Sequence, residues 1–274
     1  MINRIKNFFK RLYEIIKQPT MAILPGQLAF SLILSIIPMI VILGIIAVSF
    51  SLSLESLISF VQDTFPLKVS EILVPLINGK GFDINMIFFL ITGLLLATSG
   101  AYSIIITSNL IYDIKGGSKL KRRIKSFIIT SILLLLMCFL IIVPGFGDQI
   151  IELMKLLKIS DGFYNSMLLV YNLLKYPVSF LIIYFNIKLI YTIAPDIRVK
   201  SKNVTIGAFF TTLLWILLTR FYSFYVTNVV HYDIFYGSVS NIIILLVWMY
   251  FISYIFVIGL ALNAQKTNDN KIED

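Results

Sequence analysis

The feature that most constrains this chain is a pair of apolar runs near its C-terminal end, residues 204–225 and 241–263. No charged residue occurs between Asp233 and Lys266. A helix of about 20 apolar residues already crosses the hydrocarbon core of a bilayer, and a backbone in lipid must satisfy its hydrogen bonds internally. The two runs therefore predict a membrane hairpin of two helices joined by a short turn.

The composition places the whole chain in the polytopic membrane class. Apolar residues make up 58% of the chain and charged residues only 14%, which is about half the share in a soluble domain. The net charge of +9 would also suit a nucleic-acid partner. Its basic residues, however, flank the apolar runs, as they do in the cytoplasmic loops of membrane proteins, so we expect no nucleic-acid partner.

Hydropathy along the chain predicts an all-α fold: a polytopic integral membrane protein with six transmembrane helices and amphipathic interfacial helices. The spans are expected at residues 26–50, 84–107, 126–146, 177–193, 204–225 and 241–263. They form one transmembrane domain, 26–264, which follows a basic amphipathic arm at 1–25 and precedes a polar, disordered tail at 265–274. The arm suits either an anionic leaflet or the protein's own loops.

Prolines set the expected ends of two spans. Pro144 should end the third span, and Pro177 should open the fourth at its first turn, where proline is well tolerated. The segment between these two spans, 148–176, is expected to lie outside the membrane with an interfacial helix of its own. Lys188 lies near the inner end of the fourth span, from which its side chain should reach the cytoplasmic surface.

The distribution of Lys and Arg sets the expected orientation. Sixteen of them lie in the arm, the tail and the two loops 109–125 and 194–203, whereas the segments on the opposite side carry five. Positive residues concentrate on the cytoplasmic side of membrane proteins. Both termini are therefore expected in the cytoplasm.

The first span supplies most of the candidate substrate-binding residues, namely Gln27, Ser31, Ser35 and Pro38. Proline inside a helix leaves the carbonyl four residues earlier without its hydrogen bond, here that of Leu34, and kinks the helix. A broken helix of this kind can line a transport pathway. The alternative is a kink that serves packing alone.

The second span combines small residues with hydroxyls. Gly93, Ala97 and Ala101 recur every four residues, a spacing that lets helices approach closely. The hydroxyls of the same span could line a polar path, but hydrogen bonding to the preceding turn is the simpler explanation. Packing is the expected role of this span.

Arg220 is the fifth candidate binding residue because it lies inside the fifth span, several residues before its outer end. An arginine within a membrane span is energetically costly and marks a functional site by default. Three interpretations stay open: contact with an anionic substrate, pairing with Asp233, or extension of the side chain to lipid phosphate.

Motifs for catalysis are absent from the sequence. It contains no P-loop, dinucleotide-binding fingerprint, nucleophile elbow or zinc-protease motif. One cysteine, Cys138, and one histidine, His231, cannot form a His/Cys zinc site. We therefore expect no enzyme activity, no catalytic residue, no metal and no cofactor.

Short segments in a fixed order carry a family resemblance over nearly the whole chain. They are Gln27–Phe30, Leu34–Pro38, Asn109–Tyr112, Pro195, Gly207-Ala208, Leu214-Trp215, Phe221, Tyr225-Val226, Tyr236–Ser238, Trp248, Tyr250, Gly259 and Asn263. In this pattern the chain resembles the YihY/BrkB family of membrane proteins, long labelled ribonuclease BN. It departs from the family at Ala261, where many members have a glutamate.

The resemblance implies a bacterial inner-membrane protein with six helices. Our hypothesis is a transporter of an envelope lipid, or of another amphipathic or anionic substrate, with anionic membrane lipids as partners. A non-transporting membrane scaffold for envelope maintenance is the first alternative, and a ribonuclease is the second. The sequence defines no oligomeric state.

Overall fold

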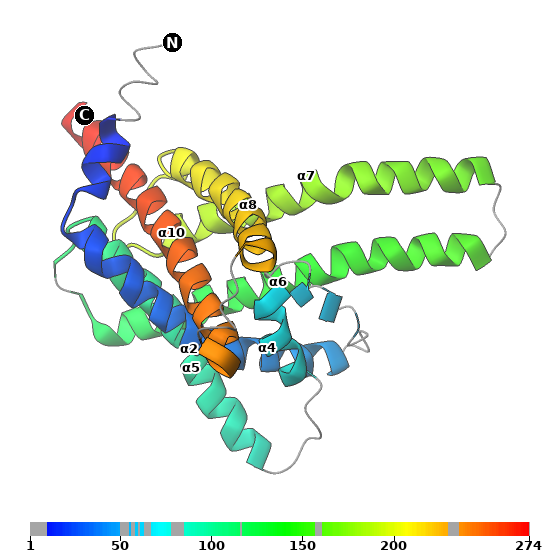
Figure 1. Cartoon of the computed structure of the whole chain (residues 1–274). Coiled ribbons are helices and arrows are strands. Elements are labelled where there is room, and N and C mark those ends of the chain that lie inside the picture. The colour runs from blue at the N-terminus through cyan, green and yellow to red at the C-terminus, as the bar shows by residue number, and fades with distance from the viewer. Residues whose placement is uncertain are drawn as a thin grey trace.

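Helices make up every secondary-structure element in the described part of the chain, as the all-α prediction required (Figure 1). The computed structural model describes residues 10–49, 55, 58–59, 61–62, 67–77, 85–115, 117–156, 161–229 and 236–273. The elements are α2 (Thr20–Ser49), α4 (Leu67–Ile77), α5 (Asn85–Ile111), α6 (Lys119–Leu156), α7 (Asp161–Ile193), α8 (Thr205–Asn228), the 3-10 turn η1 (Gly237–Val239) and α10 (Ser240–Glu273).

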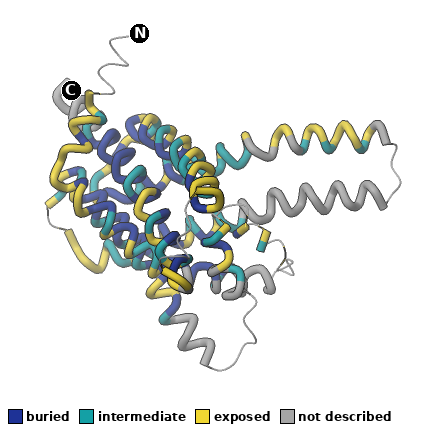
Figure 2. The backbone as a smooth tube through the Cα atoms, viewed as in Figure 1, coloured by how far each residue is buried: buried dark blue, intermediate teal, exposed yellow. Residues whose placement is uncertain are grey.

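Helix α10 is the centre of the bundle. It packs against α2 on one side and α8 on the other, and also contacts α4 and α5. Figure 2 shows the buried residues concentrated where α2, α5 and α10 meet. Val257, Leu260 and Asn263 of α10 are completely inaccessible there. The predicted C-terminal hairpin is therefore present as α8 and α10, and its second helix forms the core.

Small residues bring α2 and α5 together; the sequence predicted a close-packing surface on the second span without naming its partner. Ser35 of α2 lies so close to Gly100 of α5 that a Cβ atom at the glycine would collide with the serine hydroxyl. Pro38 lies against Gly93, where an added Cβ would be 3.6 Å from the proline Cβ. Ala97 of α5 is buried as well. These contacts support the packing interpretation of the second span.

Four described segments are long and apolar enough to cross a membrane: Thr20–Ile40, Thr92–Ile111, Thr205–Asn228 and Ser240–Gln265. They correspond to the first, second, fifth and sixth expected spans. The fourth corresponds to a shorter apolar stretch, Pro177–Ile193. The third falls in α6, where only part of the side chains are described. A membrane protein with at least these four spans is supported, and the count of six stays a prediction.

The boundaries expected from Pro144 and Pro177 were wrong. Helix α6 continues through Pro144 as far as Leu156, and Pro177 lies in the middle of α7. The segment predicted between the two spans is thus the continuation of two long helices, which project from the bundle as a hairpin (Figure 1). Proline is tolerated inside membrane helices because neighbouring groups satisfy the backbone that it frees.

The arm at the start of the chain follows one of the two interpretations that the sequence left open, whereas the end of the chain differs from expectation. Residues 10–16 are helical, and Ile15 is completely buried in a hydrophobic cluster to which α2, α5, α6, α7, α8 and α10 all contribute, which favours packing of the arm on the protein itself. At the other end the backbone of α10 stays helical to Glu273, through the segment predicted as a disordered tail.

Candidate functional site

The predicted residues of α2 divide between two surfaces. Gln27 is exposed, on the outward stripe that also carries Phe30. Ser31 is half-buried, while Ser35 and Pro38 are buried against α5. The Ser35 hydroxyl donates a hydrogen bond to the carbonyl of Leu32 in its own helix, 2.8 Å away. The four residues therefore line no common cavity in the described structure.

Arg220 lies on the surface of α8 that faces away from the bundle. It is exposed, and so are Leu217, Phe221 and Phe224 around it. No carboxylate lies within ion-pair distance of Arg220 among the residues that the structure describes. Asp233, the acid considered as its partner, lies outside the described residues.

The structure does not bring Arg220 together with the candidate residues of α2. Helix α10 lies between α2 and α8 and packs against both (Figure 1). A single site that uses both groups would need this central helix to move. The predicted site is therefore not a single site. Arg220 lies on the outer surface of α8, whereas Ser35 and Pro38 lie in the α2–α5 interface.

A charged cluster that the sequence analysis missed joins the loops at one end of the bundle. Asp196, between α7 and α8, accepts a hydrogen bond from Arg122 Nε at 2.6 Å and one from Lys125 Nζ at 2.7 Å. Asn109 at the end of α5 donates through Nδ2 to the same carboxylate at 2.7 Å, and its Oδ1 accepts the backbone N–H of Asp196 at 2.8 Å. We call these four residues the Asp196 cluster.

Lys125 also binds the end of α7 directly. Its ammonium donates hydrogen bonds to the backbone carbonyls of Ala194 and Pro195, 3.2 Å and 3.0 Å away. The last carbonyls of a helix receive no hydrogen bond from an N–H of the same helix and carry partial negative charge, so a lysine is favoured there. The cluster therefore connects the start of α6 with the ends of α5 and α7.

Local backbone geometry places Asn109 in this position. The N–H groups of Ile114 and Asp113 donate to the carbonyls of Asn109 and Leu110, at 2.8 Å and 3.2 Å, with Asp113 in the left-handed region at φ 50°. This is a Schellman motif, which ends α5 and turns the chain back. Gly117, at φ 103°, then passes Arg122 where a side chain would collide with the guanidinium.

The electrostatics of the cluster favour the ionised carboxylate. Partial burial of Asp196 opposes ionisation, but hydrogen bonds from Lys125, Arg122 and Asn109, and the charge of Lys125, outweigh it. Together they hold the pKa of Asp196 below its usual range. The side chain of Asp196 is 20% exposed and that of Arg122 is 14% exposed, so the pair is only partly shielded from solvent.

A signal for the cluster was present in the sequence. Asp196 is the single acid in a basic loop, and it directly follows Pro195, a residue of the family pattern that also contains Asn109. One carboxylate among many cations is expected to attract several of them. The sequence did not indicate which cations would be close, because that depends on where the end of α5 and the start of α6 meet.

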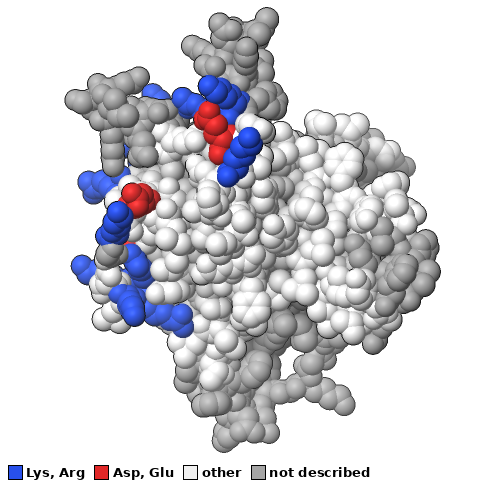
Figure 3. Space-filling view, turned by 60° about the vertical axis from the view of Figure 1, so that its left-hand side comes forward, with Lys and Arg blue, Asp and Glu red and all other residues white. Residues whose placement is uncertain are grey.

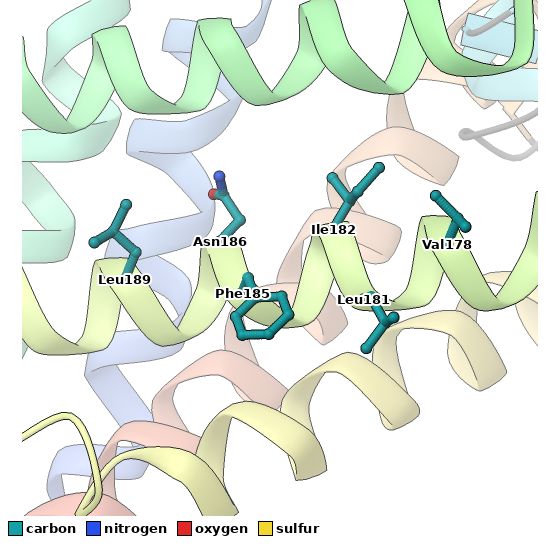
Figure 4. A pocket seen from close by; sticks show the side chains of 6 residues that line it. All are labelled: Val178, Leu181, Ile182, Phe185, Asn186 and Leu189. Atoms are coloured by element: carbon teal, nitrogen blue, oxygen red, sulfur yellow. The ribbon is translucent and has the colours of Figure 1, made fainter.

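The outward surface of α7 carries a shallow apolar hollow of about 370 Å³ (Figure 4). Its lining residues are Val178, Leu181, Ile182, Phe185, Asn186 and Leu189. Lys188 belongs to the same stretch of helix, and its ammonium lies 5.8 Å from the centre of the Tyr184 ring, one turn toward the middle of α7. The side chain therefore points along α7 away from its C-terminal end, whereas the sequence analysis expected it to point toward that end.

Several residues of the family pattern meet where α8 crosses α10. A Cβ atom on Gly207 would collide with the carbonyl of Gly259 and with the amide of Asn263, and that amide accepts the Gly207 N–H at 3.0 Å. The Tyr191 hydroxyl is 2.8 Å from the hydroxyl of Thr211 and donates to a carbonyl of α10 at 2.8 Å. These residues act in packing, since the backbones of the two helices are in direct contact.

Ala261, the departure from the family pattern, is buried in α10. In the described part of the chain, no three His, Cys, Asp or Glu side chains gather to hold a metal ion.

Comparison with known proteins identifies relatives over almost the full length. A family model described as virulence factor BrkB matches residues 16–274. The protein YfkH of Bacillus subtilis (strain 168), whose name describes it as ribonuclease-like, is 26% identical over 254 residues, which are 91% of each chain. A UPF0761 membrane protein of Vibrio campbellii (strain ATCC BAA-1116) is 24% identical over 94% of this chain and 81% of its own.

A shorter match adds a third relative. The UPF0761 membrane protein PSHAa0171 of Pseudoalteromonas translucida (strain TAC 125) is 34% identical over 86 residues, which are 31% of this chain and 28% of the relative. No solved structure matches this chain. Because the family model covers nearly all of the sequence, and two of these relatives are membrane proteins by name, the chain belongs to the BrkB family of membrane proteins.

Proposed function

We propose that this BrkB-family protein binds anionic envelope lipids from the bilayer and moves them between the two leaflets, without catalysing a chemical reaction. The observation that carries the proposal is a pair of cations, Lys188 and Arg220, on apolar helices. Arg220 is exposed and Lys188 is half-buried. A cation in a membrane span is energetically unfavourable unless an anion reaches it, and it is a candidate functional residue for that reason.

Neither cation has a carboxylate partner within the described residues. Lipid phosphate is an anion that a side chain facing the bilayer can reach. A guanidinium binds phosphate through two parallel hydrogen bonds, and a lysine ammonium binds it as a point charge. Lys188 is five residues from the end of α7 at the basic end of the bundle, and Arg220 is eight residues from the opposite end of α8.

The packing of the interior supports a path along the outer surface of the bundle. Ser35 and Thr98, at the described α2–α5 interface, donate hydrogen bonds to carbonyls within their own helices. The interface is closed by the contact of Ser35 with Gly100. We therefore assign lipid handling to the outward surfaces of α7 and α8, which contact each other through Phe180 and Phe209.

The orientation that we propose is a bacterial inner membrane with both termini in the cytoplasm. Figure 3 shows Lys and Arg along one edge of the molecule, next to a broad uncharged surface. The exposed members of this group in the loops and in the first turn of α6 are Lys115, Lys119, Lys121, Arg198, Lys200 and Lys202. The concentration of positive charge at one end supports this orientation.

The experiment is a lipid-translocation assay. Protein is reconstituted in liposomes of phosphatidylethanolamine and phosphatidylglycerol, and the movement of fluorescent phosphatidylglycerol between leaflets is followed by quenching of the outer leaflet. We expect the wild type to accelerate this movement and Lys188→Gln or Arg220→Gln to slow it. Lys200→Gln, which removes a loop cation, is the matched control. A rate equal to that of protein-free liposomes would contradict the proposal.

A membrane scaffold is the second candidate, and the α6–α7 hairpin favours it. The outer half of α7 carries exposed apolar side chains, including Phe163, Leu169 and Leu173 (Figure 2). A surface of this kind suits a protein partner within or beside the membrane. If Leu169→Glu abolishes the function in cells while lipid movement in liposomes persists, the scaffold is the better description.

A further inference from the structure

We propose that the short helix at residues 10–16, the arm helix, docks on the anionic surface of the inner leaflet with one side while its other side packs on the bundle. The arm helix lies at the same end of the bundle as the C-terminal end of α10, and α2 follows it directly (Figure 1). It is separate from Lys188 and Arg220, so its docking does not depend on the proposed movement of lipids.

The buried side of the arm helix fixes its orientation on the protein. Ile15 is completely inaccessible in the hydrophobic cluster of the bundle, and Leu12 packs against the same cluster. At 3.6 residues per turn, Leu12, Ile16 and Tyr13 lie about 60°, 100° and 160° from Ile15, all in the same rotational direction. These four side chains form one wide apolar sector, and the bundle covers only the part of it that contains Ile15 and Leu12.

The uncovered part of this sector is bordered by lysines. Tyr13 is 59% exposed and Ile16 is 46% exposed. Lys17 and Lys10, both exposed, lie about 40° and 60° beyond Tyr13 around the helix, and the Lys17 ammonium is 4.4 Å from the centre of the Tyr13 ring. Apolar side chains next to an aromatic ring and lysines are typical of a helix that lies in the plane of an anionic membrane surface.

The position of the arm helix in the chain places a membrane surface within its reach. The first described span begins at Thr20, and three residues separate it from the arm helix. A fully extended chain advances about 3.5 Å per residue, so Ile16 lies within about 14 Å of the start of the span. The span continues with exposed apolar side chains, Ile23 and Phe30, which face the lipid once α2 crosses the bilayer. The exposed part of the arm helix therefore lies next to the headgroup layer.

The charge of the arm favours an anionic surface over a neutral one. Residues 10–17 contain three cations, Lys10, Arg11 and Lys17, and one acid, Glu14. Glu14 is 4.0 Å from Lys10, and both side chains are more than half exposed. An ion pair of this kind is weak, so lipid phosphate can compete with Glu14 for the lysine. Anionic headgroups would compensate the remaining positive charge, whereas a zwitterionic surface would not.

The test follows the full chain in liposomes, with a fluorophore on one introduced cysteine in a Cys138→Ala background and a spin-labelled lipid as the quencher. The fluorophore at Ile16→Cys should be quenched strongly in liposomes rich in phosphatidylglycerol and severalfold less in pure phosphatidylcholine. Phe30→Cys on α2 should be quenched in both kinds of liposome, and Lys200→Cys in a basic loop should be quenched in neither. These two positions calibrate the signals of lipid-facing and water-facing fluorophores.

Charge variants distinguish contact with lipid phosphate from apolar insertion alone. In phosphatidylglycerol, Lys10→Gln and Lys17→Gln should each lower the ratio of docked to undocked arm about fivefold, as for the loss of one lysine at an anionic surface. Glu14→Gln should raise this ratio, because the acid no longer competes for Lys10. Lys202→Gln removes an exposed loop cation outside the arm and is the matched control, which should leave the ratio unchanged.

Three results would overturn the inference. The first is quenching at Ile16→Cys that is no stronger than at Lys200→Cys, since the arm helix would then lie in water. The second is equal quenching in phosphatidylcholine and phosphatidylglycerol, since the charge of the leaflet would then have no effect. The third is protection of the Ile16→Cys fluorophore from the lipid quencher and from aqueous acrylamide alike, since a protein surface would then cover this side of the arm helix.

Discussion

Asn109 and Asp196 bind each other twice, although 87 positions separate them in the sequence. The amide of Asn109 donates to the Asp196 carboxylate at 2.7 Å and accepts the Asp196 backbone N–H at 2.8 Å. An amide is suited to this because it offers a donor and an acceptor in fixed geometry. The pair holds the end of α5 against the loop between α7 and α8, and it presents the carboxylate to Arg122 and Lys125.

Loss of the carboxylate should destabilise the protein. Asp196→Ala leaves Arg122 and Lys125, which are 14% and 23% exposed, without their anion. We expect a loss of about 2 kcal/mol, less than for a fully buried pair, and a melting temperature lower by about 5 °C in detergent. Glu14→Gln, which removes an exposed ion pair with Lys10, is the control and should change the free energy by less than about 0.5 kcal/mol. Equal melting temperatures for the two variants would contradict a structural role of the cluster.

The contribution of Asp196 should depend on pH in the acid range. Because its pKa is lowered in the folded protein, the folded state binds fewer protons than the unfolded state at this group. The stabilisation is fully present above the unfolded-state pKa of about 3.9 and is lost as the pH falls through the lower folded-state pKa. The difference in melting temperature between wild type and Asp196→Asn should be constant from about pH 5 to 8 and shrink below about pH 4. A difference in melting temperature that grows as the pH falls would show that folding does not lower the pKa of Asp196.

The contact of α8 with α10 should tolerate no side chain. Gly207→Ala would place a methyl group against the carbonyl of Gly259 and the amide of Asn263. We expect a loss of about 2–3 kcal/mol, because two helix backbones would have to separate. Gly26→Ala is the matched control: nothing lies within 4 Å of its added Cβ, and alanine has the higher helix propensity. Thermal denaturation in detergent should show a lower melting temperature for Gly207→Ala and an unchanged or higher one for Gly26→Ala. Equal losses in both variants would indicate a general sensitivity to substitution instead of a tight contact.

The hydroxyl of Tyr191 should stabilise the meeting point of α7, α8 and α10. Tyr191→Phe removes two hydrogen bonds of 2.8 Å, to Thr211 and to the carbonyl of Phe256. A loss of about 1–2 kcal/mol is expected because the site is completely buried. Tyr250→Phe, at a position with 38% exposure, should have little effect. Similar melting temperatures for both variants would show that the Tyr191 hydrogen bonds contribute little.

The proposed orientation is tested by accessibility of single cysteines. In a Cys138→Ala background, cysteines at Ser118 and Lys200 should be protected from an impermeant thiol reagent in intact cells, and one at Tyr236 should react. All three positions are exposed in the structure, so burial in the protein does not explain protection. Reaction of Ser118→Cys from outside, without lysis, would reverse the topology.

The sequence by itself determined the class of protein, the helical fold and the charged end. These follow from local properties: apolar runs of sufficient length must be helices in lipid, and positive charge collects on one side. It also indicated that α5 packs closely against another helix, because glycine and alanine four residues apart form a flat helix surface, but it did not show that the partner is α2. The family pattern contained Asn109, Gly207 and Asn263, but the sequence did not indicate which contacts these residues make.

Only the tertiary structure decided the extent of the α6–α7 hairpin and the partners of the charged residues. Pro144 predicted a helix end from local chemistry alone, but a helix continues when its surroundings satisfy the freed backbone. The partners of Asp196 depend on three loops that meet in space. Gln27 and Arg220 were predicted as binding residues from their residue type, whereas their roles depend on which side of each helix faces away from the bundle. Those outward sides are set by the packing of α10 between α2 and α8, which no single segment of the sequence encodes.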